Sequence, residues 1–283
     1  RLLEEHYGVK LLERNGRRTS ATPFGTQLLQ EARTVLAAFD GISPRLEQLE
    51  SAESGTLRVG VTPPIADALL PHIASRLVRE SPAVELRVQI GSIDAVLEPL
   101  LEQRTEVVVG YEKLLRLQKN LEVQHLYHDV VSWWCREGHP LLEKPRLKMK
   151  DMAKYVVVSQ HLPPLYDGYI KDVLATAGEE AKVDRVNHAH RCDSYPVLIQ
   201  IVLETDAILV APTVSTRRNP LGARLRRIHL PLDAPEADLA VAFPRIPSPS
   251  PLALRFVALM KEEAELMVQE FGTPDPAAEP SPA

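Results

Sequence analysis

The apolar positions between Thr22 and Glu50 follow a spacing that is typical of a long helix packed along a partner helix. Their separations alternate between four and three residues, as in a heptad seam. The seam residues are Leu28, Ala32, Val35, Phe39, Ile42, Leu46 and Leu49. Thr22 suits the N-cap and Pro23 the first helical position, whereas Pro44 predicts a bend. We therefore predict a linker and dimerisation helix over residues 22–50. An amphipathic helix on its own domain's core is the alternative.

After a polar connector at residues 50–55, apolar strand patterns alternate with helical patterns. The expected order is strand Leu57–Thr62, helix Pro64–Arg79, strand Val84–Ile90, helix Ser92–Gln103 and strand Val107–Gly110. Strand-helix-strand units of this kind build a parallel sheet that helices cover on both faces. His125–Arg136 is a further strand candidate that could carry the chain elsewhere.

A second set of the same kind follows. It contains strand Tyr155–Ser159, helix Leu165–Ala177, strand Val183–Val186, helix Asp193–Leu203, strand Ala207–Pro212, returning strands Leu225–Leu230 and Leu239–Phe243, and helix Pro251–Phe271. The two sets predict an α/β fold with two lobes over residues 56–271. Lobe I takes about 56–125 and 231–271, and lobe II about 131–226. The Pro-rich residues 272–283 predict a disordered tail.

Composition places the chain among soluble globular proteins that stay in the cytoplasm. The 283 residues are 45% hydrophobic and 25% charged, with a net charge of −5. No apolar run approaches the roughly 18 residues of a membrane span, and the first residues lack the apolar block of a secretion signal. The two cysteines provide no disulfide framework, which fits a reducing compartment. We expect no membrane association.

A local basic cluster precedes the long helix. Arg14, Arg17 and Arg18 surround Asn15-Gly16, a dipeptide that favours tight hairpin turns. A basic hairpin leading into a helix is the shape of a DNA-binding wing, and these arginines are the candidate DNA contacts. The alternative is a solvated surface turn.

The amino-terminal residues resemble a known family. Leu3-Glu4, Gly8, Leu11-Leu12, Arg14, Arg17-Arg18, Thr22 and Gly25 fall in order on the second half of the winged helix-turn-helix of LysR-type transcriptional regulators. Leu12, Ala21 and Phe24 depart from that pattern, where phenylalanine, leucine and alanine are usual. The resemblance implies a partial winged helix-turn-helix over residues 1–21, with the earlier helices expected ahead of Arg1.

The remaining chain, to about Phe271, resembles the effector-binding domain of the same family, which is similar in fold to periplasmic solute-binding proteins. The matching phrases are LRVGVTPPIADALLP, SPAVELRVQIGS, REGHPL and AILVAP, and the departures are Glu106 and Glu204-Thr205-Asp206. The resemblance implies a regulator that binds promoter DNA as a homodimer or homotetramer and senses a small inducer between its lobes. A stand-alone solute-binding or receptor module is the alternative.

In open α/β sheets, ligands bind beyond the carboxyl ends of the strands. That rule selects Thr62, Pro63, Pro64, Gly91, Ser92, Gly110, Tyr111, Ser159, Gln160, Asp193 and Ser194. Hydroxyls and N–H groups at helix starts suit a small carboxylate or another polar metabolite. The resemblance implies inducer contacts most directly at Thr62, Ser92 and Ser194. The alternative role for each side chain is helix capping.

We predict no catalytic residues, cofactor or metal. No phosphate-binding glycine loop, G-x-S-x-G or HExxH motif occurs, so an enzyme is not expected. His188, His190 and Cys192 alternate and could bind zinc or copper, but no fourth ligand is evident. Trp133 and Trp134 are expected to face opposite sides of one strand. Cys135 and Cys192 lack a motif that would activate them as a redox pair.

Overall fold

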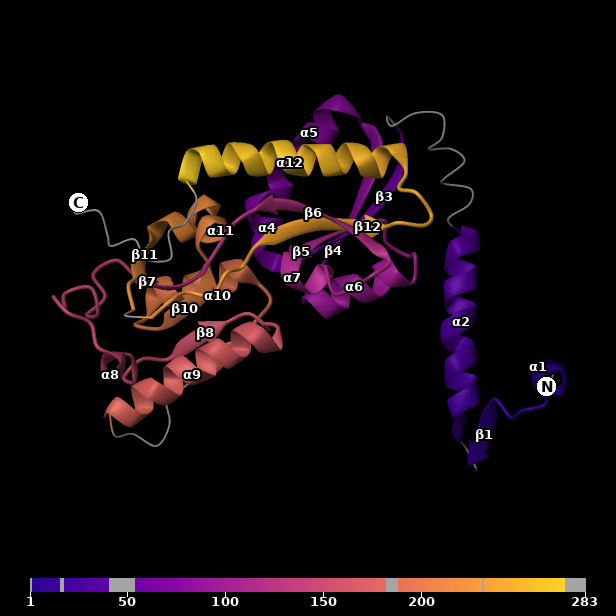
Figure 1. Cartoon of the computed structure of the whole chain (residues 1–283), viewed down its shortest axis with the longest axis horizontal. Helices are drawn as coiled ribbons and strands as arrows, with labels where there is room; N and C mark the ends of the chain where they lie inside the picture. The colour runs from indigo at the N-terminus through magenta and orange to yellow at the C-terminus, as the bar shows by residue number, and fades with distance from the viewer. Residues whose placement is uncertain (1, 16–17, 41–53, 182–187, 231, 273–283) are drawn as a thin grey trace.

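The computed structural model describes residues 2–15, 18–40, 54–181, 188–230 and 232–272. Two five-stranded sheets form the main body, and a short hairpin with a long helix precedes them (Figure 1). Among the described residues, no helix has both the length and the apolar character needed to span a bilayer.

The amino-terminal part is held together by hydrogen bonds between consecutive elements. It consists of α1 (Leu2–Tyr7), the antiparallel strands β1 (Leu12–Asn15) and β2 (Arg18–Ala21), and α2 (Pro23–Asp40). The Glu4 carboxylate accepts the N–H groups of Leu11 and Leu12 at 2.8 and 3.2 Å. These bonds lower the pKa of Glu4 and join α1 to the hairpin.

Thr22 and Gly25 fix the start of α2. The Thr22 hydroxyl accepts the Gly25 N–H at 3.0 Å and donates to the Lys10 carbonyl at 2.7 Å. A Cβ at position 25 would lie 2.0 Å from the Leu11 carbonyl oxygen, so only glycine fits. Thr22 and Gly25, two of the residues that match the family pattern, are therefore explained by the capping and packing at the start of α2. Residues 41–50 of the predicted helix lie outside the described part of the chain.

The first sheet has the order β4-β3-β5-β12-β6. Its strands are β3 (Ser54–Val61), β4 (Ala83–Ile90), β5 (Val107–Tyr111), β6 (Leu121–Tyr127) and β12 (Leu239–Pro244). The strands β4, β3 and β5 are parallel, whereas β12 runs antiparallel to both of its neighbours. Helices α5 (Leu70–Glu80) and α12 (Pro251–Phe271) supply core residues on one face, and α6 (Ile93–Leu101) supplies them on the other.

The second sheet has the order β11-β7-β10-β8-β9. Its strands are β7 (Val131–Arg136), β8 (Val157–Ser159), β9 (His188–Arg191), β10 (Ile208–Pro212) and β11 (Leu225–Ile228). Helix α9 (Pro164–Ala181) joins the core cluster that contains Trp133, whereas α10 (Tyr195–Glu204) joins the cluster that contains Trp134. The prediction that the two tryptophans face opposite sides is confirmed.

His125–Arg136 is not the one strand that was predicted, but the segment does carry the chain elsewhere, because the chain changes sheet inside it. It leaves the first sheet after Tyr127 and enters the second at Val131, and it returns between Ile228 and Leu239. The two crossing segments are hydrogen-bonded to each other. Ala237 N–H donates to the Asp129 carbonyl at 2.7 Å, and Val131 N–H donates to the Pro235 carbonyl at 2.9 Å.

The helix predicted over Pro64–Arg79 is two helices, α4 (Pro63–Ala68) and α5, with a break at Leu69. Pro71, in the first turn of α5, has no N–H to continue the preceding helix. Three short helices were not predicted: α7 (Glu112–Leu115), α8 (Met149–Met152) and α11 (Thr213–Arg218). The strand predicted over Val183–Val186 lies entirely in residues that are not described, and β9 begins at His188.

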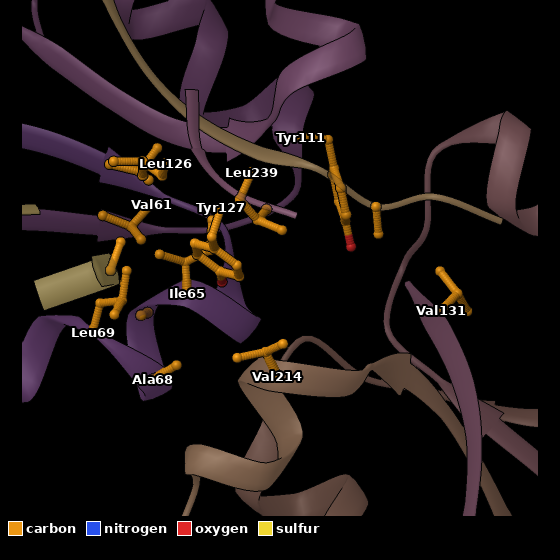
Figure 2. Packing of buried hydrophobic residues seen from close by; sticks show 14 of the residues in the cluster. Val61, Ile65, Ala68, Leu69, Tyr111, Leu126, Tyr127, Val131, Val214 and Leu239 are labelled. Atoms are coloured by element: carbon orange, nitrogen blue, oxygen red, sulfur yellow. The ribbon is translucent and has the colours of Figure 1, made fainter. Parts of the chain in front are cut away.

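One apolar core runs from the first sheet into the second. Figure 2 shows side chains of the first-sheet side, including Val61, Ile65 and Tyr127, with Val131 and Val214 of the second-sheet side. Helix α4 also contacts both α10 and α11. The boundary between the two sheets is therefore a packed region, and its polar groups need partners.

Candidate functional site

Asp129 occupies the point where the chain crosses from the first sheet to the second. Its side chain is fully buried and accepts backbone N–H groups from Val130 and Thr213, both at 2.8 Å, from Val214 at 3.0 Å and from Ser215 at 3.3 Å. Three of these donors form the first turn of α11, whose N–H groups have no partner within the helix. Asp129 thus joins the crossing segment to the amino end of α11.

Burial raises the pKa of the Asp129 carboxyl to about 6, although the backbone N–H bonds act in the opposite direction. Removing water from around a carboxylate disfavours its charged form, and the four N–H donors compensate only in part. The crossing segment therefore contains a carboxyl group that titrates close to neutral pH.

One tyrosine from the first sheet and one from helix α10, which covers the second sheet, pack against α11. The Tyr127 hydroxyl lies 3.0 Å from the Ser215 hydroxyl, and the Tyr195 hydroxyl is hydrogen-bonded to the Thr216 hydroxyl. Both tyrosines are fully buried, and burial raises the pKa of each phenol. They remain neutral and bind α11 by hydrogen bonds from β6 on one side and α10 on the other.

The predicted residues after β3 and β5 lie together. The backbone N–H of Thr62 donates to the Val109 carbonyl at 3.0 Å, and Pro63 follows in the buried first turn of α4. A Cβ at Gly110 would lie 2.7 Å from Ile93 Cδ1 and 3.3 Å from Thr62 Cγ2, so a larger residue there would displace the end of the Ile93 side chain. Thr62 is 2% exposed, and its hydroxyl has no hydrogen-bond partner among the described residues.

Tyr111, at the end of β5, makes a contact between the two halves. Its ring lies 4.9 Å from that of Tyr166 in α9, with an angle of 43° between the planes. The side chain of Tyr111 is buried, and burial raises the pKa of its phenol. The Tyr166 hydroxyl in turn donates to the Glu236 carbonyl at 3.0 Å, in the returning segment.

The second sheet contributes a polar pair after β8. Ser159 is buried, and its hydroxyl donates to the Gln160 carbonyl at 3.0 Å. Gln160 is 5% exposed, and its amide nitrogen has no hydrogen-bond partner in the described part of the chain. The sequence analysis selected both residues, because they lie at the carboxyl end of a buried strand.

The other predicted ligand residues lie at helix starts near the surface. Gly91 N–H donates to the Val61 carbonyl at 3.3 Å, and the Ser92 hydroxyl caps α6 by accepting the Ala95 N–H at 3.4 Å. The exposed Asp193 carboxylate accepts the His161 N–H at 3.2 Å and lies 3.0 Å from its Nδ1. Ser194 precedes α10 without a side-chain capping bond.

Only some of the residues predicted to contact DNA or to form the dimer seam lie in the described part of the chain. Arg14 lies in β1 and Arg18 in β2, whereas Arg17 is outside the described residues. On α2, Leu28 and Ala32 are half-buried and Val35 is 68% exposed. Leu29 and Leu36, next to the seam, are also exposed and were not predicted. Phe39 lies in α2, and Ile42, Leu46 and Leu49 lie outside the described part.

The described residues contain no group of three or more histidine, cysteine or acidic side chains arranged to hold a metal. His188 and His190 belong to β9, but their side chains are not among those described. Cys135 and Cys192 are both free. Burial raises the pKa of the Cys135 thiol to about 12, which disfavours the reactive thiolate.

Solved structures share the fold of this chain. HinK, a LysR family transcriptional regulator from Pseudomonas aeruginosa, has a TM-score of 0.57 at 18% identity, covering 93% of this chain and 85% of that chain. A putative transcriptional regulator from Vibrio parahaemolyticus has a TM-score of 0.61 at 16% identity, covering 76% of this chain and 96% of that chain. At these identities the likeness shows the two-sheet architecture alone.

Curated relatives are transcriptional regulators. An SDS degradation transcriptional activation protein from Pseudomonas sp. (strain ATCC 19151) is 30% identical over 212 residues, covering 74% of this chain and 67% of that protein. The DNA-binding transcriptional dual regulator OxyR of Escherichia coli (strain K12) is 28% identical over 263 residues, covering 92% of this chain and 82% of OxyR. Several other relatives are matched over only about half of their length, from 49% to 56%.

These relatives agree with the expectation that the chain is not an enzyme, and they do not favour a stand-alone solute-binding module. The family model of the LysR substrate binding domain matches residues 50–265, which is most of the chain and includes both sheets. The chain therefore belongs to the LysR family of transcriptional regulators, with an α/β effector-binding domain of the periplasmic-binding-protein type.

Proposed function

We propose that this protein binds promoter DNA as a homo-oligomer and changes its DNA binding when a small polar or anionic metabolite binds between its two sheets. In this proposal, residues 1–21 belong to the DNA-binding part, residues 22–50 to the dimerisation segment, and residues 56–271 to the effector-binding domain. In this proposal the protein acts in the cytoplasm, where promoter DNA is.

The observation that carries the effector site is a pair of buried polar groups that lack partners. Thr62 and Gln160 follow β3 and β8, on the two sides of the molecule, and neither the hydroxyl nor the amide nitrogen has a partner among the described residues. A buried polar group without a hydrogen bond costs about 1 to 3 kcal/mol. Both groups donate hydrogen bonds, so a ligand with carboxylate or carbonyl oxygens would satisfy them.

The crossing segments support transmission of the signal. The two sheets are joined through residues 128–130 and 234–238, which are hydrogen-bonded to each other, and through the contact between Tyr111 and Tyr166. A ligand that binds both sheets would stabilise one angle between them. β3 follows α2 in the chain, so a change of angle in the effector domain would reposition α2 and its apolar seam.

DNA binding is tested in the protein expressed from its complete reading frame. Replacing Arg14 and Arg18 with glutamine should weaken binding to the promoter and to random DNA alike, because phosphate contacts carry no sequence information. The slope of log affinity against log salt concentration should fall by about one unit for each phosphate interaction that the substitutions remove.

The matched control for this measurement is Lys119→Gln, which removes a positive charge next to the first sheet. This variant should keep the wild-type slope. An unchanged slope in the double arginine variant would show that the β1–β2 hairpin does not contact DNA.

A further inference from the structure

A hollow of about 190 Å³ lies on the first sheet beyond the carboxyl end of α6. Three arginines line it together with two polar side chains and a proline: Arg58, Arg87, Arg104, Gln89, Thr105 and Pro99. None of these residues belongs to the site between the sheets. The hollow brings three guanidinium groups into one small volume.

The backbone holds the three arginines in place. Arg58 of β3 and Arg87 of β4 are register partners on neighbouring parallel strands, so their side chains leave the same face of the sheet at a strand spacing of about 4.8 Å. Arg104 arrives from a turn after α6, in which Gln103 has a φ of 58°. The N–H groups of Arg104 and Thr105 both donate to the Pro99 carbonyl, at 2.8 and 3.1 Å, and close this turn.

The carboxylates near the hollow leave several guanidinium N–H groups available. The Nε of Arg87 donates to Glu85 at 2.9 Å, and the Nε of Arg104 donates to Glu102 at 2.6 Å. Each contact uses one edge of the guanidinium and fixes its orientation. The Arg58 side chain makes no hydrogen bond or ion pair within 4.0 Å to a described residue, although its charge contributes to lowering the pKa of Glu85. Arg58 lies directly beside another arginine, an arrangement that like charges disfavour.

We propose that this hollow binds a doubly charged oxyanion of phosphate size, either free phosphate or the phosphoryl group of a small metabolite. The planar guanidinium fork matches the geometry of phosphate oxygens and binds them through paired hydrogen bonds. The bound charge offsets the repulsion between Arg58 and Arg87. This site is separate from the metabolite site between the sheets, so each proposal stands or fails independently of the other.

The test is isothermal titration of the chain with inorganic phosphate and with methyl phosphate at constant ionic strength. Arg58→Gln should lower the affinity about tenfold or more, since it removes the guanidinium without a paired carboxylate. Arg58→Lys keeps the charge and loses the planar fork, and it should also bind more weakly than the wild type. A melting curve for each variant shows that the fold is intact.

The matched control is Lys119→Gln in a second basic hollow, of about 290 Å³, that Arg116 and Arg245 also line. Its phosphate affinity should equal that of the wild type. Binding of both ligands identifies a phosphoryl group as the ligand, and binding of phosphate alone identifies the free ion; both support the site. No binding by the wild type, or equal weakening in Lys119→Gln and Arg58→Gln, overturns it.

Discussion

The crossing point at Asp129 and the strand ends at Thr62 and Gln160 are equally buried, but their polar groups are in opposite states. The Asp129 carboxylate accepts four backbone N–H groups, whereas the Thr62 hydroxyl and the Gln160 amide nitrogen have no partner among the described residues. A fully bonded buried group stabilises the fold, and one without partners costs free energy unless something else binds it. The difference separates a structural joint from the ligand site that we propose.

The largest expected effect is at the joint. Asp129→Ala removes the acceptor of four backbone N–H groups and leaves those of Val130, Val214 and Ser215 without a partner, whereas the Thr213 N–H keeps its bond to the Val130 carbonyl. We expect a loss of about 4 kcal/mol in the free energy of unfolding, because each orphaned buried donor costs about 1 to 3 kcal/mol and the buried charge disappears at the same time. Urea unfolding followed by tryptophan fluorescence measures it.

Asp172→Ala provides the control, since this carboxylate lies on the exposed side of α9. Its free energy of unfolding should stay within about 0.5 kcal/mol of the wild type. If Asp129→Ala costs less than about 1 kcal/mol, the capping bonds do not hold the joint together, and the contrast with the strand ends disappears.

The pH dependence of the joint is the next effect in size. Burial raises the pKa of Asp129 from 3.8 to about 6, so the folded protein binds a proton more tightly than the unfolded chain does. The stability that this proton contributes is fully present below pH 3.8 and is lost as the pH rises through 6. A difference of about two pKa units corresponds to about 3 kcal/mol.

Asp129→Asn isolates this effect, because asparagine has a similar size and does not titrate. The wild type should gain stability relative to Asp129→Asn as the pH falls from 7 to 4, by up to about 3 kcal/mol. Urea unfolding of both proteins at pH 7, 5.5 and 4.5 measures the difference. A difference that stays constant over this range would mean that Asp129 does not titrate there.

The same contrast explains which parts the sequence could predict. The bounds of α12, Pro251–Phe271, were predicted correctly because a capping Ser250, Pro251 and a continuous helical pattern define them locally. For His125–Arg136 the sequence indicated only approximate lobe bounds and not the contacts that hold the crossing, because the carboxylate of Asp129 acts on residues 84 to 86 positions later in the chain. Gln160 was selected by its position after a strand, but the sequence did not show that its amide nitrogen is buried without a partner among the described residues.

The apolar seam of α2 was predicted only in part. The heptad spacing selected Leu28, Ala32 and Val35 of α2, and the exposed Leu29 and Leu36 widen the same side of the helix. A strict seven-residue pattern omits such flanking positions. Local sequence therefore predicted most of the longer elements and selected Thr62 and Gln160, whereas the lack of partners for their polar groups became evident only from tertiary packing.

The smallest effect on stability is expected at the strand end, together with a large effect on ligand binding. Thr62 makes no capping bond to α4, so Thr62→Val removes only a buried hydroxyl without a partner. The free energy of unfolding should stay within about 1 kcal/mol of the wild type or increase. The joint variant Asp129→Ala and this variant therefore differ by several kcal/mol, although both positions are buried.

Although Thr62→Val should have little effect on stability, it should have a large effect on ligand binding. A small carboxylate that raises the melting temperature of the wild type should raise that of Thr62→Val much less, because the hydroxyl that donates to the ligand is gone. Thr176→Val, on the exposed surface of α9, is the control and should respond like the wild type. If Thr62→Val is strongly destabilised, or if it responds to every stabilising carboxylate as fully as the wild type does, the Thr62 hydroxyl is part of the packing and the ligand binds elsewhere.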